Sequence, residues 1–245
     1  MKKFILCAIL SCATLQFVCA QKQYVGVQLG FTQPISRLNM PVSGKEKTLM
    51  PTTYNGFKVG VVYDATIIKG FGVTMGLNYT FGANSTPWVK KVSSQPTDYP
   101  QVSSNGLYHQ LEVPVDWQYK FEIAKRTWLM LYTGPTLQCG LSFTKKNYIN
   151  NGKDAQQDVA NPTDDIYSEE DMKDNTLKRL NVTWGIGAGF QYERYFLRGG
   201  YDFGLINPYK AYQFTEMVND GNPRTRGRFD QWQIKLGIYF WESKK

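Results

Sequence analysis

The segment that most constrains the fold is residues 229–241, near the C-terminus, where apolar and polar side chains alternate. A period of two places the two sets on opposite faces of a β-strand. One parity is apolar, and the other carries polar residues, glycine and tyrosine: Trp232, Ile234, Leu236, Ile238 and Phe240 against Gln231, Gln233, Lys235, Gly237 and Tyr239. The segment is therefore predicted to be a strand between an apolar and a polar environment.

The same alternation recurs earlier in the chain and predicts seven more strands, at residues 25–32, 56–65, 71–81, 107–121, 129–143, 180–192 and 195–205. Thr133 and Pro135 interrupt the apolar parity of the fifth strand, so a β-bulge is predicted there. Glycine is frequent on the polar parity: Gly26, Gly30, Gly56, Gly60, Gly72, Gly76, Gly185, Gly187 and Gly189.

Short and long connections alternate along the chain. Short turns are predicted at 68–70, 123–126 and 193–194, and long loops at 33–55, 82–106, 144–178 and 208–228. The loop at 82–106 is too rich in proline for a strand. An even number of antiparallel strands, with short turns at one end and long loops at the other, is typical of bacterial outer-membrane barrels. The predicted fold is all-β, an eight-stranded antiparallel up-and-down transmembrane β-barrel in which the first and last strands pair.

A soluble eight-stranded barrel of the lipocalin type is the alternative, and it would turn the apolar parity inwards. The interior of an eight-stranded barrel is only wide enough to be filled by side chains, which suits the glycine-rich parity. Aromatic residues near strand ends on the apolar parity favour two interfacial girdles. These residues are Phe31, Phe71, Phe81, Trp117, Tyr119, Phe143, Trp184, Tyr192, Tyr195, Phe203, Trp232 and Phe240.

The N-terminus has the features of a secretory signal peptide. Lys2 and Lys3 precede an apolar run that ends in a small-residue cleavage site after Ala20. An uncleaved anchor helix and a lipoprotein acylated at Cys12 or Cys19 are weaker alternatives. We expect residues 1–20 to be the signal peptide and residues 21–245 a single barrel domain in the outer membrane of a Gram-negative cell.

Cleavage changes the charge and the cysteine content of the chain. The formal charge falls from +8 to +6 when the two lysines are lost, and only Cys139 remains of four cysteines, so no intramolecular disulfide can form. This mildly basic charge does not call for nucleic acid as a partner. The mean hydropathy is −0.40, and no internal apolar run reaches the roughly 20 residues of a spanning helix, so strands must do the spanning.

Charged residues of both signs fall on the inward parity. They form either a structural network or a path for protons or ions. Because buried charges persist when they are paired, we predict a salt-bridged structural network in the narrow lumen. Its members are Lys58, Asp64, Glu112, Asp116, Lys120, Arg198, Asp202 and Lys235.

His109, the single histidine, is predicted on the outer face. Some eight-stranded barrels are lipid A-modifying enzymes that place a histidine with a serine and a carboxylate near the outer rim. Ser103 and Ser104 are close in sequence, but Glu112 lies on the opposite parity. An interfacial histidine is therefore favoured over a catalytic one, and no catalytic residue is predicted.

The long loops carry two sets of charges. The acidic residues of the third loop lack the spacing of a calcium loop, so a solvated surface is favoured over a metal site: Asp164, Asp165, Glu169, Glu170 and Asp171. The basic residues of the other loops are predicted to contact lipopolysaccharide phosphates: Lys45, Lys47, Lys90, Lys91, Arg224, Arg226 and Arg228.

Several short runs resemble the Bacteroidetes-type outer-membrane β-barrel family, called porin-like, which includes PorT-like members. They are Leu111-Glu112-Val113-Pro114-Val115, Gly134-Pro135, Arg198-Gly199-Gly200-Tyr201 with Gly204-Leu205, and the aromatic final strand. The resemblance spans the mature chain and implies the barrel fold, with no particular activity. The chain departs from many barrels in continuing beyond Trp241 as Glu242–Lys245.

Together these features predict a monomeric, non-enzymatic outer-membrane protein with a structural or surface-interaction role through its loops. No cofactor is expected. The expected partners are outer-membrane lipid, lipopolysaccharide, the barrel-insertion machinery and an unidentified protein at the loops. Three other functions remain open: an accessory component of a secretion or surface-assembly machine, a lipid A-modifying enzyme, and a narrow channel.

Overall fold

The computed structural model describes residues 22–42, 45–48, 52–86, 101–150, 158–159, 178–208 and 226–244, all in strands or their connections. Within these residues, no helix is long and apolar enough to cross a membrane. The described part of the chain contains eight long strands: β1 (Lys22–Val42), β4 (Asn55–Ile68), β5 (Phe71–Thr86), β6 (Gln101–Ala124), β7 (Thr127–Asn150), β9 (Leu180–Tyr192), β10 (Tyr195–Gly204) and β11 (Arg226–Lys244). Short strands lie near the loop end: β2 (Lys45–Thr48), β3 (Thr52–Thr53) and β8 (Asp158–Val159).

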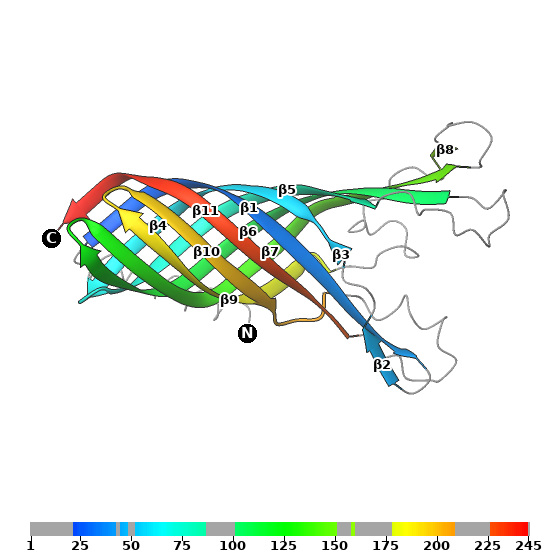
Figure 1. Cartoon of the computed structure of the whole chain (residues 1–245), viewed down its shortest axis with the longest axis horizontal. Helices are drawn as coiled ribbons and strands as arrows, with labels where there is room; N and C mark the ends of the chain where they lie inside the picture. The colour runs from blue at the N-terminus through cyan, green and yellow to red at the C-terminus, as the bar shows by residue number, and fades with distance from the viewer. Residues whose placement is uncertain are drawn as a thin grey trace, which may run out of the picture.

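The eight long strands form a closed antiparallel ring (Figure 1). Each pairs with the next long strand in the chain, and β11 pairs with β1, for example at Leu29–Leu236 and Phe31–Ile234. Closure leaves no long strand with an unpaired edge along the barrel wall, as a membrane-spanning sheet requires. The predicted fold class and the predicted closure between the first and last strands are confirmed.

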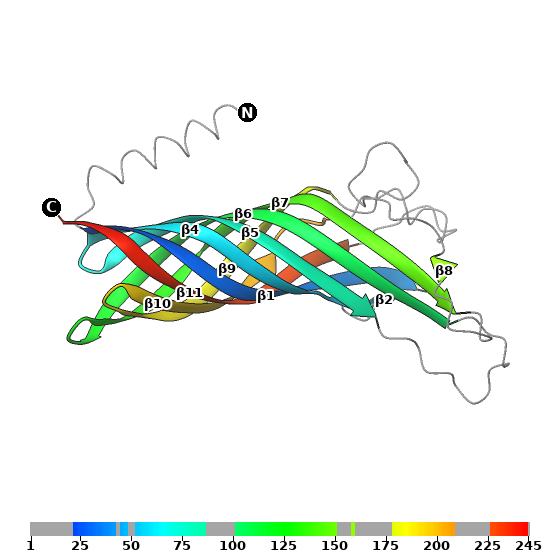
Figure 2. The same ribbon diagram turned by 90° about the horizontal axis from the view of Figure 1, so that it is seen from above.

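The two ends of the barrel differ as expected. Three two-residue turns join strands at one end, at 69–70, 125–126 and 193–194. At the first of these, Lys69 and Gly70 have φ values of 44° and 88°, and two positive φ values suit the type I′ turn of a tight hairpin. The start of β1 and the end of β11 lie at this turn end, and the ends of β1, β5 and β7 lie at the opposite end of the barrel, which we call the loop end (Figures 1 and 2).

Side-chain exposure follows the predicted alternation along most of each strand. On β11, Leu236 is 61% exposed, whereas the adjacent Lys235 is 2% exposed. The bulky apolar residues of the barrel wall therefore face outwards, and the glycine-rich parity faces inwards. This arrangement suits a wall that contacts lipid on its outer surface.

Two local predictions on β7 are wrong. Trp117 pairs with Thr133 and Pro114 pairs with Thr136, which is one continuous register, so no bulge occurs at Thr133–Pro135. The register instead shifts where His109 pairs with Ser142 and Gln110 pairs with Gly140, which leaves Leu141 as an extra residue. Because a bulge reverses the alternation beyond it, Phe143 points inwards and is only 8% exposed, and does not belong to an outer aromatic girdle.

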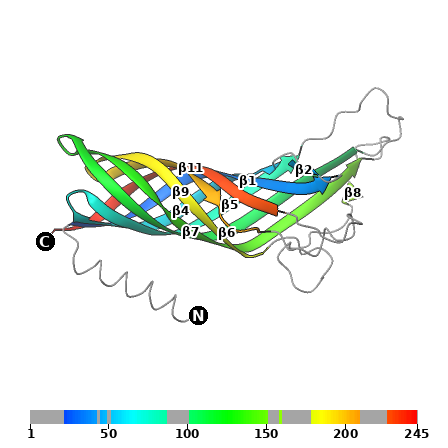
Figure 3. The same ribbon diagram turned by 90° about the horizontal axis from the view of Figure 1, so that it is seen from below.

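The strands also extend further towards the loop end than predicted. Residues 33–42 continue β1, and β5 and β6 occupy both ends of the 82–106 segment that was expected to be loop. Strand β7 likewise extends to Asn150, so the β6–β7 ladder projects beyond the rest of the barrel (Figure 3). Pro34 is accommodated because its carbonyl oxygen accepts a hydrogen bond from the Tyr54 amide, at 2.9 Å.

The C-terminal extension beyond Trp241 continues the ladder. Residues 242–244 pair with residues 22–24 of β1. A register shift lies just before them, because Val25 pairs with Trp241 and Gly26 with Tyr239. The tail is thus part of the barrel wall at the turn end.

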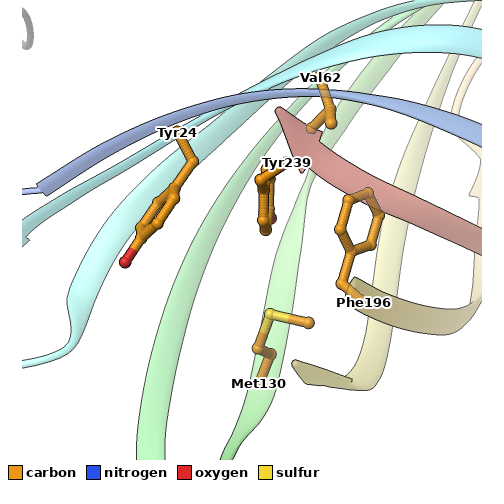
Figure 4. Close-up of a cluster of buried hydrophobic side chains, with 5 residues drawn as sticks. All are labelled: Tyr24, Val62, Met130, Phe196 and Tyr239. Atoms are coloured by element: carbon orange, nitrogen blue, oxygen red, sulfur yellow. The ribbon is translucent and has the colours of Figure 1, made fainter. Parts of the chain in front are cut away.

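Aromatic side chains occupy space that the inward glycines leave free. Near the turn end, five inward residues form a buried cluster (Figure 4): Tyr24, Val62, Met130, Phe196 and Tyr239. A Cβ atom on Gly237 would collide with the Phe196 ring, and one on Gly187 would collide with the Tyr132 ring. At these two positions glycine is needed because a large ring from a neighbouring strand lies against it.

Candidate functional site: the barrel interior and the loop-end rim

The eight inward charges predicted from the sequence all lie inside the barrel, where each side chain is at most 7% exposed. They comprise four cations and four anions, so their formal charges sum to zero. Towards the loop end, Lys58 forms an ion pair with Glu112 and donates a hydrogen bond to Gln233 Oε1, at 2.7 Å. Asp202 accepts hydrogen bonds from Gln231 and Gln233, at 2.8 and 2.9 Å. Gln233 therefore links the Lys58–Glu112 pair to Asp202.

A second group of contacts lies towards the turn end. Asp64 forms an ion pair with Lys120 at 2.9 Å and accepts hydrogen bonds from Tyr239 Oη and Gln118 Nε2, at 2.8 and 2.7 Å. Arg198 donates a 2.6 Å hydrogen bond to the Gln118 side-chain oxygen. Gln118 thereby connects Asp64 to Arg198.

The remaining predicted charges lie beside Arg198. Asp116 is 4.0 Å from its guanidinium, at the limit of an ion pair. Lys235, 2% exposed, interacts electrostatically with the like charges of Lys58 and Arg198 and with the opposite charges of Asp116 and Asp202. The interior charges thus form two hydrogen-bonded groups joined through neighbouring charges, and such a network is rigid when its members are satisfied.

Pockets lie on either side of this network. At the loop end, a pocket with an accessible volume of about 50 Å³ is lined by aromatic rings, including Tyr54, Tyr108 and Phe143. At the turn end, a pocket of about 230 Å³ is lined partly by Tyr24 and Lys120. Lys120 and the rings of Tyr24 and Tyr239 approach one another at 5.1 and 5.7 Å, as cation–π pairs. Lys120 of the charge network and Tyr24 of the buried cluster therefore border the turn-end pocket.

His109 lies on the outer face, as its parity predicted. Its Nδ1 atom is 2.6 Å from the hydroxyl oxygen of Tyr79, and the two rings stack with a centroid distance of 6.0 Å. Glu112 points into the lumen towards Lys58. The side chains of Ser103 and Ser104 lie outside the described residues. Within the described part of the chain, His109 is therefore partnered by a tyrosine on the wall surface.

Most of the predicted loop contacts lie outside the described side chains. This holds for Lys45, Lys47, Lys90, Lys91, Arg224 and Arg226, and for the acidic set Asp164, Asp165, Glu169, Glu170 and Asp171. Elsewhere, among residues that are described, no group of three histidine, cysteine or acidic side chains could hold a metal ion. Arg228 is described, and its side chain is half-exposed beside Asp230.

Sequence analysis missed the partners of Arg228. Asp230 is fully buried, yet it lies on the outward parity of β11, and Arg37 contacts it from β1. Arg37 fell in a predicted loop and is 193 positions from Asp230, so the pair was not recognisable. Extending the alternation of residues 229–241 by one residue towards the N-terminus would have placed Arg228 and Asp230 on one face.

Residues 19–209 match the model of a family described as outer membrane protein beta-barrel domain. No curated protein matches the sequence.

Three solved structures illustrate the similarity. The Ail protein of Yersinia pestis is 12% identical, with a TM-score of 0.36 and coverage of 90% of this chain and 99% of that one. Neisserial surface protein A is 11% identical, with a TM-score of 0.36 and coverage of 87% and 97%. OprG from Pseudomonas aeruginosa is 11% identical, with a TM-score of 0.43 and coverage of 90% and 96%.

Proposed function

Because this chain belongs to the family of outer membrane protein beta-barrel domains, we propose that it is a non-enzymatic, non-conducting barrel with a structural or surface-interaction role at its loop end. The observation that carries this proposal is the filled interior. Eight charges of zero net formal charge and a cluster of buried aromatic and apolar side chains occupy the lumen. A rigid, filled scaffold leaves the connections at the loop end as the part that can bind.

The orientation of the barrel in the membrane follows from the lengths of the connections at its two ends. In outer-membrane barrels the short turns face the periplasm and the longer loops face outwards. We accordingly place the loop end at the cell surface, after export and cleavage of the signal peptide following Ala20. The aromatic end of β11 would be recognised by the insertion machinery, and the monomer would be the functional unit.

Site-specific photo-crosslinking on intact cells tests this function. A photoreactive residue is introduced at loop positions 90, 165 and 215, and for comparison at turn positions 69 and 125. A surface-interaction role predicts protein or lipopolysaccharide adducts from the loop positions that are lost when intact cells are treated with protease or the loops are shortened.

Adducts formed only from the turn positions would contradict the surface role, because those positions face the periplasm. They would favour an accessory component of a secretion or surface-assembly machine. Heat-modifiable gel mobility of each variant would verify that the barrel had folded before the adducts were compared.

The lipid A-modifying alternative has a direct test of its own. His109→Ala should leave the lipid A profile of the cells unchanged, because the described partner of His109 is Tyr79. A changed profile on mass spectrometry would contradict the non-enzymatic proposal.

A further inference from the structure

A cationic cluster lies on the outer face of the barrel at the loop end, where β1 meets β11. We name it the rim cluster, and it consists of Arg37, Arg228 and Asp230. Arg37 pairs with Arg228 across the two strands, and Asp230 pairs with Ile35. All three belong to the parity that carries Trp232 and other outward residues of β11. The two exposed arginines therefore face the surroundings of the barrel, and the buried Asp230 behind them also borders the loop-end pocket.

One buried carboxylate holds both arginines. Asp230 Oδ2 is 2.9 Å from Arg37 Nε and 3.0 Å from Arg228 Nε, and its Oδ1 accepts a 3.0 Å hydrogen bond from the Gly204 amide. Since both Nε atoms lie within 3.0 Å of the same oxygen, they are at most 5.9 Å apart. The aspartate thus holds two like charges close together.

The rim cluster carries a net positive charge that Asp230 does not neutralise. The Asp230 side chain is inaccessible to solvent, whereas those of Arg37 and Arg228 are 40% and 50% exposed. Two guanidinium groups on one carboxylate leave a net charge of +1. Each guanidinium contacts Asp230 through Nε, which leaves terminal N–H groups on both arginines, and Arg37 also interacts with Tyr201. Neighbouring guanidinium groups of this kind match the oxygens of a phosphate.

Neighbouring aromatic side chains indicate how deep the rim cluster lies in the membrane. Phe31 packs against Trp232 at 5.4 Å and against Phe57 at 5.9 Å, and Phe57 packs against Phe81 at 5.8 Å, which makes a belt across four strands. Aromatic belts mark the boundary between acyl chains and headgroups. Arg228 lies four residues beyond Trp232, about 13 Å along the strand and about 10 Å along the barrel axis after tilt. This distance places Arg228 at the depth of the lipid headgroups.

We propose that Arg37 and Arg228 bind a phosphate group of lipopolysaccharide in the outer leaflet, with Asp230 positioning them. The inference rests on the proposed placement of the loop end at the cell surface. A lipid phosphate is favoured over a soluble anion because the cluster lies on the outer wall above the aromatic belt, where headgroups surround it. The binding strengthens the contact between the barrel seam, where β1 and β11 close the ring, and the outer leaflet.

The test compares phosphorylated lipid A with the same lipid after enzymatic removal of its phosphates. Folded, delipidated protein is titrated with each lipid in mixed micelles, and bound lipid is counted by native mass spectrometry. The wild-type protein should retain phosphorylated lipid A about tenfold or more better than the dephosphorylated lipid, as expected for charge-assisted hydrogen bonds. Arg37→Ser/Arg228→Ser should abolish this preference.

Two further variants separate binding from folding. In Arg37→Ser/Asp230→Asn/Arg228→Ser the buried carboxylate is removed with its partners, so no unpaired charge remains, and the loss of preference should be the same. The matched control is Arg126→Ser, which removes an exposed arginine ion-paired with Glu193 at the turn end. It should leave the preference unchanged.

The inference fails if the wild-type protein does not distinguish the two lipids, or if the folded triple variant retains the wild-type preference. Neither result would affect the proposed surface role, which the loop crosslinks test separately. Conversely, loop crosslinks could fail while the phosphate preference persists, and the rim cluster would then stand as a lipid site alone.

Discussion

Gly237 and Gly199 show how strongly single residues in neighbouring strands of this barrel differ in the space around them. A Cβ atom on Gly237 would collide with the Phe196 ring and the Val27 carbonyl oxygen, whereas one on Gly199 would meet only the Gln233 carbonyl oxygen, at 3.9 Å. Gly237 is on the inward parity and Gly199, paired with the exposed Ile234, is on the outward parity, so Gly199 is the control for testing how tightly the interior is packed.

Gly237→Ala is expected to lower the free energy of unfolding by about 1–3 kcal/mol, as overpacking does, and Gly199→Ala by less than about 0.5 kcal/mol. Urea titration of the protein refolded in lipid vesicles would measure both. Trimming the obstructing ring with Phe196→Leu should recover part of the loss in Gly237→Ala. Equal losses at the two glycines would show that the interior is not packed as described.

The Lys58–Glu112 ion pair gives a second test at this scale. Glu112→Ala leaves the buried Lys58 without its charge partner, which is expected to cost about 3–5 kcal/mol. Lys58→Met/Glu112→Gln removes both charges and keeps an acceptor for Thr80, which hydrogen-bonds Glu112 at 2.9 Å. The double variant should therefore lose less stability than the single one.

The exposed Arg126–Glu193 pair is the control, since removing Arg126 should change the free energy of unfolding far less than Glu112→Ala does. If Glu112→Ala were as mild as Arg126→Ser in the same urea titration, the interior network would not be a structural element of the barrel.

At the scale of the strand, the bulge in β7 is the main departure from simple alternation. Leu141 is the extra residue, 40% exposed, and beyond it Phe143 turns inwards to pack near Tyr108 and Tyr54. The bulge brings a large aromatic ring to the loop-end mouth, where uninterrupted alternation would have put a smaller inward side chain, Thr144.

Cysteine labelling from the lipid phase tests this reversal. In a Cys139→Ser background, single cysteines at positions 137 and 141 should react with a membrane-soluble maleimide, because both wild-type side chains face outwards. Cysteines at 138 and 143 should be protected by at least about an order of magnitude in rate, since these side chains are 4% and 8% exposed. Equal labelling at 141 and 143 would mean that β7 keeps its alternation and has no bulge.

The sequence predicts the elements well wherever a side chain's position depends only on its own strand. The outward Leu236 and the inward Lys235 follow from a period of two. Phe143 could not be placed, because a bulge depends on the pairing partner and leaves no local signature in 129–143. The strand extensions past residue 32 were missed because Pro34 suggested a loop, whereas its carbonyl group still pairs.

For the molecule as a whole, the inward charges were predictable and their partners were not. Parity alone puts Lys58, Asp64 and Lys120 inside, but which carboxylate each lysine meets depends on how eight strands are staggered around the ring. Arg37 and Asp230 meet only because the first and last strands close the barrel. Contacts between side chains of β1 and β11 could therefore not be predicted from the sequence.

Side chains fill the interior of the barrel. Inward rings lie against inward glycines, charges of opposite sign pair between strands, and the two together occupy the space between the loop-end and turn-end pockets. A barrel of eight strands has room for little else. The proposed function as a surface scaffold follows from this filling.

Planar-bilayer recording tests the filled interior most directly. Refolded protein, verified by heat-modifiable mobility, is added to a bilayer with a general porin as the positive control. We expect no current steps above background at neutral pH, because the charge network and the aromatic cluster block the lumen. Reproducible unitary conductance that scales with the amount of folded barrel would contradict the account and establish a channel.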